Sequence, residues 1–261
     1  MEFRRDAHLE ALRSGRFDLL VVGGGITGLG VALDAASRGL SVALVERDDF
    51  SSGTSSKSSK LAHGGLRYLQ QGEVRLVYEA LHERQRMLRN APHLVQVMPF
   101  MIPILTKDGV ISKKIARALG SALWMHDLTG GWRIGKLHRR LRAREAHAHF
   151  PTMPADKLSS GYLYYDATVD DSRLCIAVAR TAAELGATIV NRCGVTTITH
   201  DATGKANGAR VRTLEGEEFT VSATSIVNAG GVWADEVRTA DEGRDPHSIR
   251  PAKGVHITIP W

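Results

Sequence analysis

The sequence contains few cysteines and no long apolar run. Cys175 and Cys193 are the only cysteines among its 261 residues. Two cysteines are too few for a disulfide framework or a metal site, and this usage is typical of a reducing cytoplasm. No apolar run approaches the ~20 residues that a membrane-spanning helix needs, and the amino terminus, Met1–Asp6, carries no recognisable secretory signal. These absences favour a cytoplasmic protein without a metal centre or a membrane-spanning helix.

The composition is ordinary for a globular protein, apart from an excess of positive charge. Hydrophobic residues make up 43% of the chain, charged residues make up 24%, and the formal net charge is +6. The length is sufficient for one large domain, or for one domain with a smaller one grafted onto it. The positive charge predicts an anionic partner, which leaves phosphorylated substrates, acidic lipids and nucleic acid open.

The stretch from Phe17 to Glu46 organises the chain. An apolar run at 17–22 is followed by glycines spaced G-x-G-x-x-G, by a helical pattern that ends at Gly39, and by a second apolar run that ends at Glu46. This order predicts a strand, a glycine turn, a helix and a second strand, which is the dinucleotide-binding unit of an α/β fold. The agreement of all its parts favours a dinucleotide site over an ordinary glycine turn, but it does not distinguish FAD from NAD.

Each residue type in this unit suits a dinucleotide. Gly23 permits the tight turn, Gly25 lets the backbone approach a pyrophosphate, and Gly28 lets the helix pack close to the strand. The N–H groups at the start of the helix then face the phosphates. The carboxylate of Glu46 can accept hydrogen bonds from both hydroxyls of the adenosine ribose, and it disfavours the 2′-phosphate of NADP.

Residues 51–60 are rich in serine and follow the second strand of this unit. Such a composition alone predicts a flexible linker. Its position after Glu46 favours a cofactor loop, in which hydroxyl and N–H groups face the pyrophosphate and the ring of the bound cofactor.

The remaining pattern alternates helices and strands. Helices are predicted at 6–14, 73–90, 112–126 and 172–185. Strands are predicted at 95–105, 161–165, 187–191, 194–200, 209–214, 218–223, 224–227 and 253–259.

Basic residues gather on and after the third predicted helix, where they are Lys113, Lys114, Arg117, Arg133, Lys136, Arg139, Arg140, Arg142 and Arg144. Two interpretations stay open: a solvated face of a lid domain, or a patch that lies on anionic lipid at the inner face of the cell membrane. Nucleic acid is not predicted as a partner, because no nucleic-acid-binding motif accompanies the charge.

Residues 54–69, TSSKSSKLAHGGLRYL, closely resemble the segment after the first FAD motif in the FAD-dependent, respiratory glycerol-3-phosphate dehydrogenases. Residues 170–174, 227–233 and 253–257 resemble later landmarks of that family, in the same order. The resemblance implies a Rossmann-like FAD-binding domain of the two-dinucleotide-fold type, with part of an α+β substrate or lid domain. It implies boundaries at 1–90 and 166–235 for the FAD-binding domain, 91–165 for a helical basic insertion, and 236–261 for the start of the substrate domain.

The resemblance also implies the chemistry, which is oxidation of glycerol 3-phosphate to dihydroxyacetone phosphate by hydride transfer to flavin N5, with quinone as the electron acceptor. The cofactor residues that it implies are Gly23, Gly25, Gly28, Glu46, Thr54, Ser55, Ser56, Ser59, Lys60, Leu61, Val195, Ala229 and Gly230. Arg67 would bind the substrate phosphate, with Tyr68 beside it, and arginine suits this task because its charged fork matches phosphate oxygens. His256 is the candidate base, although a histidine between Val255 and Ile257 on a strand is also typical of simple packing.

Family members continue beyond the position of Trp261, so the chain is predicted to be an N-terminal portion, either truncated or one piece of a split enzyme. Three alternatives stay open: an FAD-binding fragment that needs a partner chain, an oxidase that uses oxygen, and an amine or amino-acid oxidase of the same superfamily. A homodimer or a complementing C-terminal chain is the expected protein partner.

Overall fold

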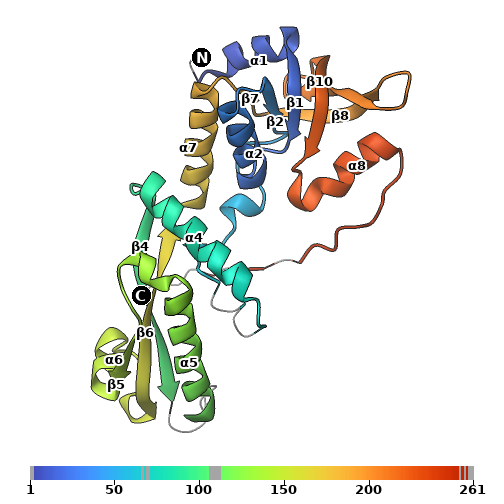
Figure 1. Ribbon diagram of the computed structural model, residues 1–261. Helices are drawn as coiled ribbons and strands as arrows, with labels where there is room; N and C mark the ends of the chain where they lie inside the picture. Colours follow the sequence, from blue (N-terminus) through green and yellow to red (C-terminus); the bar gives the residue numbers. More distant parts are fainter. Residues whose placement is uncertain are drawn as a thin grey trace. The chain divides into compact units, whose positions relative to one another are not determined.

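The computed structural model describes residues 3–65, 68, 71–105, 113–252, 254–255 and 257. The chain forms two compact units (Figure 1). The first unit combines Met1–Ser58 with Asp171–Trp261, and the second is Ser59–Asp170.

The first unit is built on a six-stranded sheet with the strand order β7-β2-β1-β10-β9-β8. Its strands are β1 (Arg16–Val22), β2 (Val42–Val45), β7 (Thr188–Val190), β8 (Cys193–His200), β9 (Ala206–Thr213) and β10 (Glu218–Asn228). Strands β7, β2, β1 and β10 are parallel neighbours, whereas β10, β9 and β8 form an antiparallel meander. The predicted α/β class and the strand–helix–strand order of residues 17–46 are therefore confirmed.

The prediction of separate strands at 218–223 and 224–227 is wrong, because β10 runs without a break from Glu218 to Asn228. Its first half pairs with β9 in an antiparallel arrangement, and from Ser222 onward it pairs with β1 in a parallel arrangement. A change of neighbour within one strand leaves no mark in the local sequence.

The sheet buries apolar side chains on both faces. Leu20 and Val22 belong to one core cluster, whereas Val21, between them, belongs to the other. Successive side chains of a strand point to opposite faces, so this alternation places β1 at the centre of both cores.

Two helices of the first unit pack closely on each other because their contact is made of small side chains. Helix α2 (Ile26–Ser37) buries Ala32, Ala35 and Ala36, and helix α7 (Asp171–Glu184) buries Cys175, Ala179 and Ala182 in the same cluster. Helix α1 (Arg5–Ser14) lies against β7, and α8 (Ala234–Glu242) lies against β8.

The second unit is organised around the long central strand β6. Its strands are β3 (Leu61–Ala62), β4 (Val95–Leu105), β5 (Arg139–Arg142) and β6 (Leu158–Val169), and its helices are α4 (Val74–Asn90), α5 (Lys113–Thr129) and α6 (Ala143–His149). Strands β3, β4 and β5 all pair with β6 in antiparallel register. The four predicted helices are confirmed as α1, α4, α5 and α7, and the strand predicted at 161–165 is part of the longer β6.

The division between the units differs from the boundaries predicted from sequence. Residues 59–90 belong with the second unit, because β3 pairs with β6 and the Lys60 carbonyl accepts a hydrogen bond from the Val169 N–H at 2.9 Å. Helix α8 belongs with the first unit because it packs on β8. The strand predicted at 253–259 lies mostly outside the described residues.

Candidate functional site

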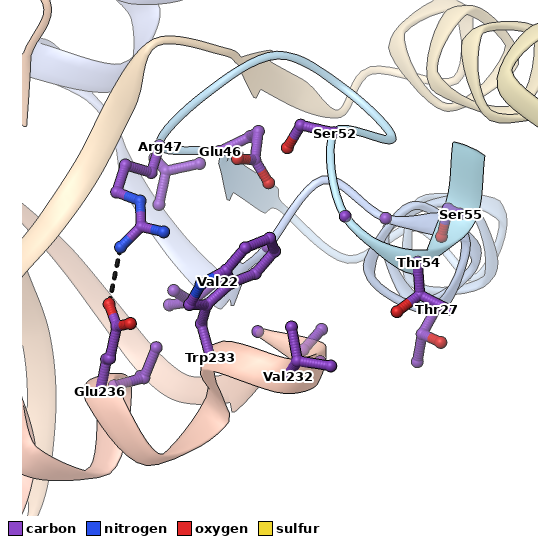
Figure 2. A pocket seen from close by; sticks show the side chains of 18 of the residues that line it. Val22, Thr27, Glu46, Arg47, Ser52, Thr54, Ser55, Val232, Trp233 and Glu236 are labelled. Atoms are coloured by element: carbon purple, nitrogen blue, oxygen red, sulfur yellow. Dashed lines mark hydrogen bonds and ion pairs between the residues drawn. The ribbon is translucent and has the colours of Figure 1, made fainter. Parts of the chain in front are cut away.

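A pocket of about 410 Å³ lies in the first unit, at the carboxyl ends of β1 and β2 (Figure 2). Its walls come from the ends of these strands, the start of α2, the serine-rich loop, the start of β8 and the segment after β10. In parallel α/β sheets, ligands bind outside the carboxyl ends of the strands, where this pocket lies. The predicted cofactor residues that line it are Gly23, Gly25, Glu46, Thr54, Ser55, Val195, Ala229 and Gly230.

Two of the three motif glycines are required by the packing of backbone on backbone. Gly23 has φ +116°, and a Cβ added to it would lie 2.4 Å from the carbonyl oxygen of Ala229. A Cβ added to Gly28 would lie 2.0 Å from the carbonyl oxygen of Gly23. Glycine at these two positions therefore lets the ends of β1 and β10 and the first turn of α2 come together.

Gly25 has a different role. It is the N-cap residue of α2 with an extended backbone (φ −79°, ψ 176°), which any residue can adopt. A Cβ added there would have only Ser55 within 4 Å, with its hydroxyl oxygen at 3.0 Å and its Cβ at 4.0 Å, so only this side chain would have to shift slightly. Since neither backbone conformation nor packing of the protein requires glycine here, its effect is to keep the pocket open in front of the helix.

The start of α2 faces this pocket through Gly25, Ile26 and Thr27. The N–H of Ile26 donates to the Ser55 hydroxyl at 2.9 Å. The serine-rich loop thus reaches the start of the helix, where the partial positive charge of a helix N-terminus favours a phosphate group. The Ser55 side chain also hydrogen-bonds with the Cys175 side chain, so it ties the loop to α7 as well as to the start of α2.

Glu46 lines the pocket with a carboxylate that is already held by the backbone. Its Oε2 accepts a hydrogen bond from the Gly24 N–H at 2.6 Å, and its Oε1 accepts one from the Asp48 N–H at 2.7 Å. Each carboxylate oxygen has a second acceptor position. The two backbone contacts therefore orient the group without using up its capacity for ribose hydroxyls.

Three side chains that the sequence analysis did not assign complete one wall (Figure 2). Arg47 donates to the Glu236 carboxylate at 2.6 Å, and its guanidinium lies 5.4 Å from the centre of the Trp233 ring. The ring packs on the serine-rich loop, since a Cβ added to Gly53 would lie 2.7 Å from it. Arg47 directly follows Glu46, and Trp233 lies in the landmark at 227–233, so the sequence next to predicted site residues could have indicated that both line the site. The place of Glu236 in the site follows only from the fold.

The remaining predicted site residues do not line this pocket. Gly28 packs behind it, and the Ser56 hydroxyl donates to the Gly53 carbonyl at 3.3 Å. Ser59, Lys60, Leu61 and Tyr68 belong to the second unit. Arg67 and His256 lie outside the described residues.

Tyr68 contacts Gly65 and His63 in the second unit. Its N–H donates to the Gly65 carbonyl at 2.8 Å, and its ring centre lies 6.3 Å from that of His63. The His63 Nδ1 accepts a hydrogen bond from the Gly65 N–H at 3.1 Å. The His63 ring and the Tyr68 main chain thus both hydrogen-bond to the backbone of Gly65.

The two cysteines are buried free thiols. Burial raises the pKa of both Cys175 and Cys193 to about 11, so they stay protonated near neutral pH. Within the described ranges, no cluster of three or more His, Cys, Asp or Glu side chains is placed to hold a metal ion. Across that same part of the chain, every helix is too short or too polar to cross a membrane.

Residues 18–261 match the model of a protein family described as FAD dependent oxidoreductase (DAO). The chain is 44% identical to a mitochondrial glycerol-3-phosphate dehydrogenase of Arabidopsis thaliana, over 98% of this chain and 42% of that protein. It is 40% identical to an aerobic glycerol-3-phosphate dehydrogenase of Staphylococcus aureus, over 98% of this chain and 46% of that protein. Among solved structures, it is similar to the glycerol-3-phosphate dehydrogenase from Bacillus halodurans complexed with FAD, with 30% identity and a TM-score of 0.69 over 91% of this chain and 38% of that chain. The chain thus spans less than half the length of these relatives, and the resemblance drawn from residues 54–69 is confirmed.

Proposed function

Since the chain belongs to the family of FAD-dependent oxidoreductases, we propose that it forms the FAD-binding part of an enzyme that oxidises glycerol 3-phosphate. The pocket at the start of α2 is the observation that supports this most directly, because it joins a helix N-terminus, a closely packed glycine turn and an acid at the end of the second strand. The similarity to glycerol-3-phosphate dehydrogenases supports the choice of substrate. When bound, FAD supplies the hydride acceptor, which is N5 of its ring.

In this proposal, the pocket holds the adenosine and pyrophosphate of FAD. The open space at Gly25 and the N–H groups of the first turn of α2 receive the pyrophosphate. Glu46 accepts hydrogen bonds from the ribose hydroxyls. Val195 presents its backbone to the adenine, and Ala229 and Gly230 pack under the cofactor.

The substrate side of the proposal rests on residues that the resemblance implies. Arg67 binds the phosphate of glycerol 3-phosphate, Tyr68 lies beside it, and His256 accepts the hydroxyl proton. In a protein that turns over, Arg67→Ala should raise KM strongly, with a loss of about 2–4 kcal/mol of transition-state binding for one charge-assisted contact. An unchanged KM would place the phosphate elsewhere.

Quinone is the proposed electron acceptor, reached at an anionic membrane surface. The second unit carries exposed apolar side chains close in sequence to exposed basic ones: Trp132 is 57% exposed and Leu137 51%, and Lys136, Arg139 and Arg140 are exposed as well. Apolar and basic side chains together suit binding to anionic lipid. Flotation with vesicles that contain anionic lipid, against neutral vesicles at the same salt concentration, tests this contact; equal binding to both would contradict it. A homodimer or a complementing C-terminal chain remains the proposed protein partner.

The decisive experiment uses the purified chain. We expect it to bind FAD and turn yellow, and we expect glycerol 3-phosphate to bleach the colour without oxygen, with reoxidation by a quinone analogue. Protein that stays colourless at saturating FAD would overturn the cofactor site. Yellow protein that glycerol 3-phosphate does not bleach would mean that this chain binds FAD but needs a partner for turnover. Sarcosine and D-amino acids serve as control substrates, and bleaching by these alone would reassign the substrate class.

A further inference from the structure

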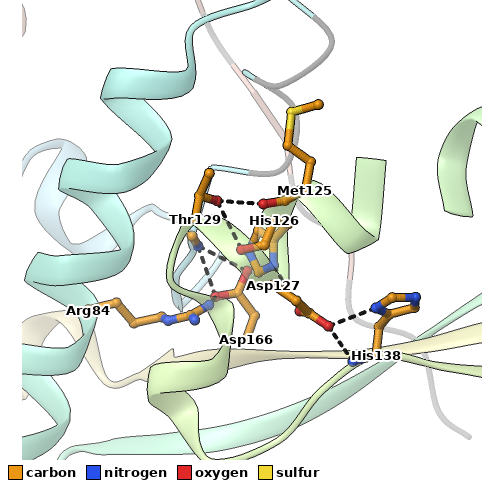
Figure 3. Close-up of polar contacts among 8 residues, drawn as sticks. Arg84, Met125, His126, Asp127, Thr129, His138 and Asp166 are labelled. Atoms are coloured by element: carbon orange, nitrogen blue, oxygen red, sulfur yellow. Dashed lines mark hydrogen bonds and ion pairs between the residues drawn. The ribbon is translucent and has the colours of Figure 1, made fainter. Parts of the chain in front are cut away.

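A buried ion pair joins Arg84 and Asp166 in the second unit (Figure 3), and it contacts the turn at Gly64 and Gly65. Arg84 of α4 is 2% exposed and Asp166 of β6 is 4% exposed. The Arg84 Nη1 donates to the Asp166 Oδ1 at 2.8 Å. Burying two charges is costly unless both are paired and hydrogen-bonded, and such pairs are weak evidence for stability.

The same carboxylate holds the backbone of the turn. The Gly64 N–H donates to the Asp166 Oδ1 at 3.0 Å and to its Oδ2 at 3.2 Å, and the Ala167 N–H donates to Oδ1 at 3.1 Å. Hydrogen bonds to a charged acceptor are the strong ones among protein hydrogen bonds. Because the Asp166 carboxylate is also held by the guanidinium of Arg84, it is a fixed anchor for Gly64.

Gly64 is also confined by its surroundings. A Cβ added to it would lie 2.3 Å from the Leu81 Cδ2, 2.8 Å from the Arg84 Nη1 and 2.8 Å from the His126 Nε2. The backbone of this residue is therefore pressed against α4 and α5, with the anchoring carboxylate on its N–H. A shift of Gly64 would require these side chains to move.

The anchor reaches the two rings through one residue. Gly65 follows Gly64 with φ +74°, donates its N–H to the His63 Nδ1 and accepts the Tyr68 N–H on its carbonyl. The His63 ring and the Tyr68 backbone are thus tied to the peptide units on either side of Gly65. The position of Gly64 consequently sets the positions of His63 and Tyr68.

We propose that Arg84 and Asp166 are positioning residues, which hold the turn at Gly64 and Gly65, and through it His63 and Tyr68, in the geometry that substrate binding needs. This proposal rests on the proposed function for its substrate, since Tyr68 is the described residue of the predicted substrate segment. The pair acts on the substrate only through the backbone of Gly64.

The anchor itself is tested by amide hydrogen exchange in the 261-residue chain. In Asp166→Ala, exchange at the Gly64 and Gly65 amides should rise by about tenfold or more, the factor expected for losing a hydrogen bond to a charged group. Asp166→Asn keeps one acceptor oxygen, so its exchange rates at Gly64 and Gly65 should lie between those of the wild type and of Asp166→Ala. It also serves as a second variant if Asp166→Ala does not fold. The matched control is Leu141→Ala, which opens a cavity in β5 of the same unit at a residue that is 1% exposed. It should lower the stability of the unit without a selective rise at Gly64 and Gly65.

The functional consequence is tested in the flavin-loaded protein that turns over glycerol 3-phosphate. Asp166→Ala should raise KM by about tenfold or more with a smaller change in kcat and with unchanged flavin content, since a misplaced binding turn weakens the ground-state complex and the transition state alike. Leu141→Ala should change neither constant at a temperature where it stays folded. Unchanged protection of Gly64 in both Asp166 variants would overturn the anchor. A selective loss of protection with an unchanged KM would overturn the positioning role, whereas a wild-type protein that stays colourless at saturating FAD would overturn the proposed function and leave the anchor measurable by exchange.

Discussion

Two alanine substitutions in the same motif should change different properties, because Gly28 and Gly25 are needed for different reasons: one should lower thermal stability and the other should weaken FAD binding. In Gly28→Ala the new methyl group would lie 2.0 Å from the carbonyl oxygen of Gly23, which is backbone and cannot turn aside. Overpacking of this kind costs about 3 kcal/mol, and alanine returns about 1 kcal/mol of helix propensity relative to glycine. The net loss of about 2 kcal/mol should lower the Tm by roughly 4–8 °C in a chain of this size.

Gly25→Ala should leave the fold intact and weaken the binding of FAD. The new methyl group would meet the Ser55 hydroxyl at 3.0 Å, and the backbone at this position suits alanine. It would stand between the start of α2 and the pyrophosphate, where the loss of one charge-assisted contact of about 2 kcal/mol raises the Kd for FAD by about 30-fold. The larger Gly25→Val should abolish retention of FAD.

Thermal unfolding followed by circular dichroism without FAD measures the first effect, and quenching of flavin fluorescence during titration measures the second. Gly25→Ala should melt within about 2 °C of the wild type, since a loss well below 1 kcal/mol is expected. A wild-type Tm for Gly28→Ala would refute the packing argument. Wild-type affinity of Gly25→Ala or Gly25→Val for FAD would refute the assigned pyrophosphate position.

Three further outcomes are expected. Glu46→Gln places an NH₂ group against the Gly24 or Asp48 N–H, so calorimetric titration should show FAD binding weaker by about 1–3 kcal/mol, whereas equal affinity would remove Glu46 from the site. Burial raises the pKa of Cys175 and Cys193 from 9.0 to about 11, so both thiols should react with iodoacetamide at pH 8 only after unfolding. The thiols of the unfolded chain ionise at lower pH than those of the folded chain. The free energy of unfolding should therefore fall by about 2–3 kcal/mol per thiol as the pH rises from 9.0 through about 11. Burial opposes ionisation of Asp127, but hydrogen bonds from His126 and from the backbone and ring of His138 outweigh it and lower the Asp127 pKa (Figure 3). The ionised Asp127 should therefore stabilise the folded state above the unfolded pKa of about 3.9. This contribution should disappear as the pH falls through the lower pKa of the folded state. Urea unfolding between about pH 2 and 6 should show this loss in the wild type and a smaller one in Asp127→Asn; equal slopes would contradict it.

The sequence by itself determined the dinucleotide-binding unit and its family. The glycine spacing, the apolar runs on either side and Glu46 lie within 17–46, where each residue acts on neighbours that are close along the chain. Helices α1, α4, α5 and α7 were predictable for the same reason, since apolar periodicity and end signals are local. The motif at 54–69 identified the family because it is a contiguous pattern.

Only the tertiary structure decided which distant residues share a site. Glu236 pairs with Arg47 across 189 positions, and Asp166 anchors Gly64 across 102. The continuous strand β10 and the division at Ser58 and Asp171 likewise follow from pairing between segments far apart in the chain. Such contacts depend on which strand lies beside which, and a single sequence does not record that choice locally.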